Sequence, residues 1–600
     1  MRAFALGLLV AATACLPGYA AEPDGPANLI DKTEALRIGV QGVLSAKPAD
    51  TNARKVQKDA LLDYYAVPDQ KLLWVSDKGL TERAKLVMAE IAKADDYGLR
   101  ASDYELPDAD AFNPSELGAK DWLAEAEAKL STAVLDYAKD ARGGRLEPLR
   151  LSKNLDPTLA LPDPSEVLAV IAIRSDPGAY LRSFQPDQPQ FEALRQKLIE
   201  LRGGKTEETK PAVVVTIPDG PALKFGMQHE HVALLRARLD IPEGENPAKF
   251  DEAVLDAVRQ FQASNGTAAD GVVGAGTRRV LNGGQRQQKA VGSETRIRQV
   301  LVNMERWRWL PHDLGPFYVT VNIPEFTMRV VEDDAPIHTA RVVVGKRNTQ
   351  TPVIQDEMET IVFNPYWNVP NSIKNEEIAP YFGQGGGGGF FGGGWDTSVL
   401  KRHGLRLKYG SRIIDPDTVD WSRHDLRSFD LVQPPGPGNV LGKVKFLFPN
   451  SHDVYMHDTT QKHLFNNAVR AESHGCMRVQ NPDQLAEILL RRDKNWSRAQ
   501  LDSVWHGRED NPIALDHKIP VYVTYFTLRV NDDGSFSSFN DLYGHDARML
   551  AALDGKSYAP EAFGDAAVAA NQWTSPAPVR RYRPGRNSGG ADFARSLFGF

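Results

Sequence analysis

Residues 454–479 read VYMHDTTQKHLFNNAVRAESHGCMRV, and this stretch carries the most information about the fold. It begins with an apolar run, Val454–Met456, that is typical of a buried strand and ends at His457. A glycine-containing loop then holds Cys476, and Asn481-Pro482 follows as a predicted N-cap and first helical residue. The order strand, loop and helix predicts a β-rich domain flanked by helices.

His457 and Cys476 are the residue types that nucleophilic catalysis requires. A thiol attacks a carbonyl only as a thiolate, and a neighbouring imidazole can take its proton. The backbone N–H groups of Gly475 and Cys476 are candidate donors to an oxyanion. A third group usually orients the base. The Asp458 carboxylate and a backbone carbonyl are both candidates, and the sequence does not choose between them.

The spacing of these residues resembles the signature of the L,D-transpeptidases: His457, fifteen residues, then Ser473-His474-Gly475-Cys476. Further matches to that family are Asn322-Ile323-Pro324, Val344-Gly345, Thr351-Pro352, the FNPYWNVP stretch at 363–370 and the KFLFPN stretch at 445–450. The chain looks like the large proteobacterial members over residues 60–545. One departure from the smaller members is Arg478, where many have Asn.

The resemblance implies a mechanism and a role for each motif residue. Cys476 would attack the carbonyl of the third residue of a peptidoglycan stem peptide and release D-alanine, with His457 as the proton shuttle. A diaminopimelate amine of a second stem would then complete a 3-3 crosslink. His474 and Gly475 would shape the oxyanion loop, and Arg478 and Ser473 would contact substrate. Carbapenems acylate the same thiol in this family, which acts in peptidoglycan biosynthesis and cell shape and needs no cofactor or metal.

Other interpretations remain open at this stage. The same acyl-enzyme could pass its acyl group to water or to an amine of an outer-membrane protein. The chain could also be a non-catalytic wall-binding scaffold. Instead of shaping the loop, His474 could transfer a proton or have a purely structural role. Instead of contacting substrate, Arg478 could form a salt bridge within the domain.

The regions around the motif predict a multidomain α+β protein. Residues 313–545 alternate with period two in several runs, among them 317–321, 326–331, 339–344 and 519–530, and predict a sandwich-like or barrel-like catalytic domain. An insertion at about 372–443 predicts a cap beside the site, or a floppy surface insertion instead. It contains nine glycines within residues 383–394, which favours a flexible loop.

Residues 223–285 resemble a small three-helix peptidoglycan-binding domain. His231, Val232, Leu235 and Leu239 have helical spacing, a second helix begins near Phe250-Asp251, and a third covers 277–281. The resemblance implies an anchor to the cell wall. A connecting helix is predicted over 286–312.

Residues 21–205 predict a helical scaffold, best seen in the breaker-poor stretch 122–141, and residues 206–222 predict a linker. Residues 546–600 lose periodicity, contain the basic run Arg580-Arg581-Tyr582-Arg583, and predict a disordered tail.

The N-terminus predicts a secretory signal peptide over residues 1–20. Arg2 precedes a 14-residue apolar run, and the small residues before Ala20 suit cleavage there. Cleavage would leave Cys476 as the only cysteine of two, whereas a lipid-modified Cys15 is the rival interpretation. We therefore expect a periplasmic protein that is peripheral at most to a membrane.

Composition excludes several classes of protein. The chain has 600 residues, of which 42% are hydrophobic and 25% are charged, values that exclude a collagen-like, wholly disordered or polytopic membrane protein. The net charge of −7 provides no overall attraction for nucleic acid.

Overall fold

The computed structural model describes residues 32–68, 70–116, 118–203, 215–239, 241–242, 244, 246–264, 271–282, 293–382 and 397–556. The chain divides into two compact units. The first comprises the chain up to Ala89, Tyr104–Asp136 and Asp163–Gly178, and the second comprises Glu90–Asp103, Tyr137–Pro162 and the chain from Ala179 onward. The predicted signal peptide 1–20, the lipidation candidate Cys15, the glycine-rich stretch 383–394 and the basic run 580–583 lie outside the described residues.

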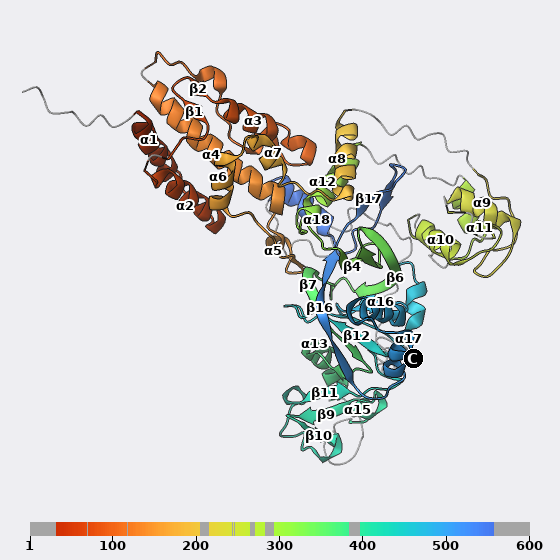
Figure 1. The fold of residues 1–600 in the computed structure, drawn as a ribbon. Helices are drawn as coiled ribbons and strands as arrows, with labels where there is room; N and C mark the ends of the chain where they lie inside the picture. The colour runs from red at the N-terminus through yellow and green to blue at the C-terminus, as the bar shows by residue number, and fades with distance from the viewer. Residues whose placement is uncertain are drawn as a thin grey trace, which may run out of the picture. The chain divides into compact units, whose positions relative to one another are not determined.

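The first unit is helical and is built around one buried carboxylate. Glu127 accepts hydrogen bonds from the backbone N–H groups of Leu73, Trp74 and Val75 and from the Tyr65 hydroxyl. These bonds offset the cost of burying the carboxylate. The elements with residues in this unit, some of which continue into the second, are α1 Lys32–Ala46, α2 Asn52–Ala66, β1 Val75–Ser76, β2 Gly79–Leu80, α3 Glu82–Ile91, η3 Ala109–Ala111, α4 Ala119–Gly143, α6 Pro164–Ile173 and α7 Pro177–Arg182 (Figure 1).

Part of the region 21–205, predicted as a helical scaffold, belongs to the second unit. In helix α8, Pro189–Arg202, Leu194 and Leu198 share a core with Val300 and Met304 of α12, Ser293–Trp307. The other elements of this part are η1 Ala94–Tyr97, η2 Ala101–Asp103, α5 Pro148–Leu151 and β3 Leu155–Asp156. Periodicity identifies helices but does not show which core they bury their apolar faces in.

Residues 223–282 contain the three helices predicted there, which are α9 Glu230–Arg238, α10 Glu252–Ser264 and α11 Ala275–Asn282. Val232, Leu235, Val254, Val258 and Leu281 are fully buried in one small core. The apolar positions that predicted the helices therefore build the interior of this domain.

The largest part of the second unit is a β-barrel. Its strands follow the order β12-β13-β15-β6-β5-β4-β16-β7, and a pairing of β12 with β7 closes the ring. β3 pairs in parallel with β7, and β14 pairs with β6. The strands are β4 Phe317–Asn322, β5 Thr327–Glu332, β6 Ala335–Gly345, β7 Val353–Phe363, β12 Val444–Leu447, β13 Met456–His457, β14 Ala471–Ser473, β15 Met477–Val479 and β16 Asn511–Thr524.

Helices α16, Pro482–Lys494, and α17, Arg498–Trp505, contribute buried leucines to the barrel core. Figure 1 shows α16 beside β16, with which it is in contact. Pro482 is the first residue of α16, as predicted, but Asn481 has a left-handed backbone and its side chain makes no capping bond. Asn481 is therefore the N-cap residue, as predicted, but it caps the helix without a side-chain bond.

The end of the chain also differs from the prediction. The run 519–530 is divided between β16 and β17, Leu528–Val530, which pairs with β18, Phe536–Ser538. Helix α18, His545–Leu553, occupies the start of the predicted disordered tail and buries His545 and Met549. A helix this short gives a weak periodic signal, and its stability comes from burial.

The insertion after β7 is a folded cap with its own core. It contains a four-stranded sheet of order β10-β9-β11-β8, and its buried side chains include Trp367, Trp421, Phe429 and Leu431. A floppy insertion would not bury such a cluster. The elements of the cap are β8 Trp367–Asn368, α13 Asn371–Ile373, η4 Lys374–Ile378, α14 Ala379–Phe382, α15 Ser398–Arg402, β9 Arg406–Tyr409, β10 Arg412–Ile414, η5 Pro416–Thr418, η6 Leu426–Ser428 and β11 Asp430–Gln433. A short helix outside the cap, η7 Lys462–Asn466, follows β13.

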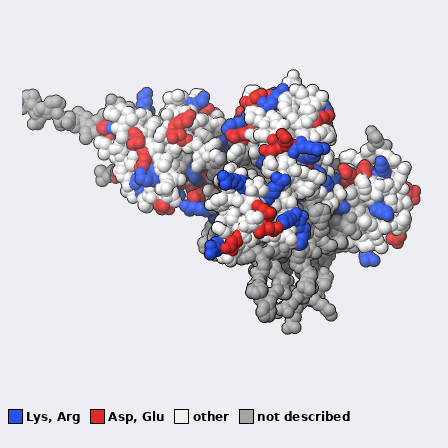
Figure 2. All heavy atoms as spheres, turned by 90° about the horizontal axis from the view of Figure 1, so that it is seen from below, with Lys and Arg blue, Asp and Glu red and all other residues white. Residues whose placement is uncertain are grey.

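Two further observations concern the surface and the membrane. Over the described residues drawn in Figure 2, basic and acidic side chains are interspersed, and no broad area carries a single sign. In the described ranges, no helix combines the length and the apolar character needed to cross a bilayer.

Candidate active site

Two parallel neighbouring strands bring Cys476 and His457 together. In the register of β13 and β15, Met456 is paired with Met477 and His457 with Arg478. Cys476 directly precedes β15, so it lies one position before this register, next to Tyr455. The barrel thus places two residues that are nineteen positions apart in sequence at one end of adjacent strands.

A cavity of about 590 Å³ opens at this end. Five of the six residues predicted for the site line it, which are His457, Ser473, His474, Cys476 and Arg478. Other lining residues come from the cap and include Trp367, Asp430 and Leu441. The sixth residue, Gly475, is buried.

His457 is oriented by a backbone carbonyl. Its Nδ1 contacts the carbonyl oxygen of Asp458, which only accepts hydrogen bonds, so Nδ1 carries the proton and Nε2 keeps its lone pair. The Asp458 carboxylate instead accepts from the N–H groups of Lys443, at 2.8 Å, and Thr459, at 2.7 Å, and contacts the Lys462 ammonium. Asp458 therefore acts on His457 through its main chain, and its side chain fixes that main chain.

The thiol and the imidazole are both held in their neutral forms. Burial raises the pKa of Cys476 to about 11, an effect that hydrogen bonds from Tyr455 and the charge of Arg478 only partly oppose. Burial, followed by the positive charge of Arg478, lowers the pKa of His457 to about 3. A neutral imidazole with a free Nε2 is suited to act as a general base.

Tyr455 is a site residue that the sequence analysis missed. It lies beside Cys476 in the register of β13 and β15, it lowers the pKa of the Cys476 thiol against the effect of burial, and its ring lies 5.7 Å from that of His457, centroid to centroid. The available signal was strand periodicity, because residues 455 and 457 lie on one face of a strand.

The nucleophile loop, residues 473–476, is fixed by hydrogen bonds within itself. The Ser473 hydroxyl donates to the Cys476 carbonyl at 2.6 Å and accepts from the Gly475 N–H at 3.2 Å. Gly475 has φ +119°, which a residue with a side chain rarely adopts. The Gly475 N–H is thus already used, and within the described residues the Cys476 N–H has no protein acceptor. Of the two predicted oxyanion donors, the structure leaves Cys476 N–H available.

Family models match three parts of the chain. A scaffold domain matches residues 59–198, a peptidoglycan binding domain matches 232–281, and an L,D-transpeptidase catalytic domain matches 316–499. The last match contains the cavity, His457 and Cys476. The chain carries an L,D-transpeptidase catalytic domain.

Individual relatives were also found. An L,D-transpeptidase homologue of Haemophilus influenzae is 30% identical over 261 residues, which are 43% of this chain and 50% of the relative. The chain therefore spans about half the length of this relative. The solved L,D-transpeptidase of Xylanimonas cellulosilytica is 14% identical, with a TM-score of 0.20 over 51% of this chain and 99% of that one. A fused zinc-dependent amidase, peptidase and peptidoglycan-binding protein of Clostridium acetobutylicum is 12% identical, with a TM-score of 0.14 over 51% of this chain and all of that one.

The transpeptidase barrel extends beyond the matched residues. β3 precedes residue 316, and all of β16 and α18 follow residue 499, yet β3 and β16 both pair with β7. The folded domain that contains the site is therefore larger than the part that the family model covers.

Arg478 lies in the wall of the transpeptidase cavity. It is buried, its guanidinium donates to the Gln461 side chain, and burial lowers its pKa to about 10. The charges of Cys476 and Glu472 oppose that decrease. Arg478 thus remains a cation beside the thiol at neutral pH and can hold a carboxylate or stabilise a thiolate.

Proposed function

We propose that this protein is a peptidoglycan L,D-transpeptidase that forms 3-3 crosslinks through a thioester at Cys476. The observation that carries the proposal is that Cys476 and His457 line one cavity, with Nδ1 of His457 engaged and Nε2 available as a base. The acyl donor would be a stem peptide, and the acceptor would be the side-chain amine of a second stem.

The proposed acylation begins with proton transfer from the Cys476 thiol to Nε2 of His457. The sulfur attacks the carbonyl carbon of the third stem residue, and the Cys476 N–H stabilises the oxyanion, to which one donor typically contributes about 3 kcal/mol. The intermediate then collapses. The C–N bond breaks, His457 returns the proton to the departing amine of D-alanine, and a thioester remains.

Deacylation repeats these steps with a different nucleophile. The acceptor amine attacks the thioester carbonyl and loses a proton to His457. The C–S bond breaks, and the sulfur recovers the proton as the new amide forms. The neutral resting pair suits both halves, because the same imidazole accepts and returns one proton in each.

The remaining assignments of the proposal concern substrate, place and anchoring. Arg478 is proposed to bind a substrate carboxylate, whereas the Ser473 hydroxyl is already committed to the loop, so Ser473 and His474 are proposed as loop-shaping residues. The three-helix domain is proposed to hold the protein on peptidoglycan, which would raise the local substrate concentration. A signal peptide would place the protein in the periplasm.

The test uses purified protein, tetrapeptide muropeptides and mass spectrometry of the protein and of the products. We expect a thioester adduct at residue 476, release of D-alanine and a dimer with a 3-3 bond, all absent with Cys476→Ala. Release of D-alanine without a dimer would favour water as the acceptor. A dimer formed with an outer-membrane protein would favour that amine. If the folded protein forms no adduct with muropeptides or with a carbapenem, the proposed enzymatic function is refuted and a wall-binding scaffold is favoured.

A further inference from the structure

The carbonyl of Gly475 is held from behind by Thr351. The Thr351 hydroxyl donates to the Gly475 oxygen at 2.7 Å and accepts from the Gly345 N–H at 2.8 Å. Thr351 is fully buried, so these bonds do not compete with solvent. Its hydroxyl connects the 345–351 turn to the nucleophile loop.

This bond determines the direction of the Cys476 N–H. The Gly475 carbonyl and the Cys476 N–H belong to one planar trans peptide, and they point in opposite directions. When Thr351 holds the carbonyl toward the interior, the N–H must point away from Thr351. This N–H is the donor that the loop leaves available to an oxyanion.

Thr351 is positioned in turn by Tyr543. The Tyr543 hydroxyl donates to the Gly345 carbonyl at 2.7 Å and accepts from the Thr351 N–H at 3.2 Å. Gly345 lies so close to the turn that a Cβ there would be 2.1 Å from the Thr349 carbonyl oxygen. One buried phenol thus fixes both ends of the turn that carries Thr351.

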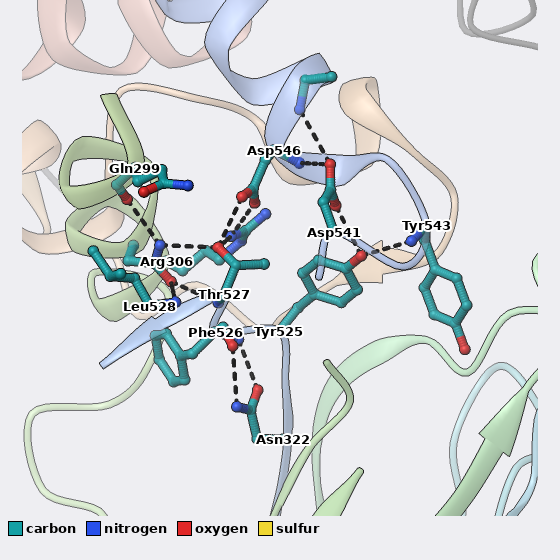
Figure 3. A network of polar contacts seen from close by, with 12 residues as sticks. Gln299, Arg306, Asn322, Tyr525, Phe526, Thr527, Leu528, Asp541, Tyr543 and Asp546 are labelled. Atoms are coloured by element: carbon teal, nitrogen blue, oxygen red, sulfur yellow. Dashed lines mark hydrogen bonds and ion pairs between the residues drawn. The ribbon is translucent and has the colours of Figure 1, made fainter. Parts of the chain in front are cut away.

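Tyr543 is itself held by a network of polar contacts (Figure 3). Its N–H donates to the Tyr525 hydroxyl at 2.6 Å, and Tyr525 donates to the Asp541 carboxylate at 2.8 Å. Asp541 also accepts from the Asp546 N–H at the start of α18, at 3.0 Å. Figure 3 shows Tyr525 between Asp541 and Tyr543, with the Tyr543 ring directed away from this network.

We propose that Tyr543 is a positioning residue for the transpeptidase reaction, which acts through Thr351 to aim the Cys476 N–H at the developing oxyanion. The inference rests on the proposed function and adds to it a residue outside the matched catalytic domain, 44 positions after its end at residue 499. Tyr543 touches neither the thiol nor the imidazole in any contact described here. Its effect should therefore be confined to steps in which an oxyanion forms.

Two reactions of the same sulfur separate this role from a general structural one. Acylation by a carbapenem passes through an oxyanion, whereas alkylation by iodoacetamide attacks a saturated carbon and forms none. Both rates are measured on the full chain by intact-protein mass spectrometry. Removing one oxyanion donor typically costs a factor of about 100 to 1,000, and misdirecting it should cost less. We expect Tyr543→Phe to slow acylation about tenfold and to change alkylation by less than about twofold.

A matched control is available on β16. The Tyr522 hydroxyl donates to the Leu314 carbonyl at 3.1 Å and makes no bond to the turn or the loop among the contacts described. Tyr522→Phe removes the same atom from another buried tyrosine and should leave both rates unchanged.

Substitutions at Thr351 provide a second test if Tyr543→Phe does not fold. Thr351→Val keeps the shape but lacks the hydroxyl and should slow acylation about 30-fold, whereas Thr351→Ser keeps the hydroxyl and should restore most of the rate. Wild-type acylation rates in Tyr543→Phe or Thr351→Val, or equal losses in acylation and alkylation, would overturn the inference alone. A wild-type protein that is alkylated but never acylated would refute the proposed function, and the inference with it.

Discussion

The Cys476–His457 pair should be electrically neutral at pH 7. The pKa values of about 11 and about 3 differ by about 8 units, which disfavours the thiolate–imidazolium form by about 11 kcal/mol. Attraction between two opposite charges about 4 Å apart returns only about 4 kcal/mol at an effective dielectric constant of about 20. The neutral form therefore prevails by several kcal/mol.

A pH titration followed by the ultraviolet absorbance of the thiolate measures the charge on Cys476. With a pKa of about 11, about one Cys476 in a hundred is ionised at pH 9. A free cysteine with a pKa of about 8.5 would be about three-quarters ionised at that pH. Subtracting the spectrum of Cys476→Ser removes the tyrosinate signal and any signal from Cys15. We expect almost no difference absorbance below pH 9 and a rise toward pH 11.

A charged resting pair would behave differently in the same titration. A preformed ion pair would give close to one full equivalent of thiolate at pH 7 and little change up to pH 9. That outcome would mean that the cavity stabilises charge on the sulfur more strongly than burial opposes it. The mechanism would then begin from a thiolate, and His457 would act first as an acid.

Three other predictions test the supports of the site and the folded units. Asp458→Asn should lower the free energy of unfolding by about 1–3 kcal/mol and slow acylation, because an amide cannot accept all the bonds of that carboxylate; urea unfolding and carbapenem acylation measure the two effects. Glu127→Gln should destabilise the first unit by about 2–4 kcal/mol, because its amide group would face backbone donors, and an unchanged midpoint in urea unfolding followed by tryptophan fluorescence would contradict this. Burial lowers the pKa of His403 to about 4 from an ordinary 6.5, so the contribution of neutral His403 to the free energy of unfolding is present above pH 6.5 and is lost as the pH falls toward 4. His403→Gln should reduce the loss of unfolding free energy between pH 7 and pH 4.5 by up to about 3 kcal/mol, as measured by unfolding at both pH values.

The sequence predicted the parts of the site that lie within one short stretch. His457 and Cys476 lie in a motif with fixed spacing, and the strand before them was visible from its apolar residues. The cap, the β-rich domain and the three small helices also followed from periodicity and turn residues. These features depend on local patterns, which a single sequence displays.

The parts that the sequence did not predict depend on contacts between distant segments. Thr351 belongs to a recognised motif, but its bond to Gly475 joins residues 124 positions apart. Tyr543 lies in a region predicted only as the end of the domain, and its partner Gly345 is 198 positions away. No local pattern encodes such a pairing, because it depends on how the barrel closes.

The sequence also does not show which atom of a motif residue acts in the site. The sequence leaves the Asp458 carboxylate and a backbone carbonyl as candidates to orient His457, and the structure uses the Asp458 carbonyl. The Gly475 N–H was considered as an oxyanion donor, and the structure commits it to Ser473. Residue types do not show which atom of a residue is used, since rotations of a few backbone bonds decide it.

The pairing of β3 with β7 makes the order of synthesis important for folding. Leu155 is made about 200 residues before its partner Val353, and at about 5–20 residues per second the interval lasts roughly 10–40 seconds. β16 is made still later, so the edge of β7 that pairs with β16 stays unpaired until most of the polypeptide exists. An unpaired edge can bind other chains. Assembly of the barrel is thus a late event that joins both ends of the polypeptide, and a protein cut at residues 316 and 499 would lack the strands that complete it.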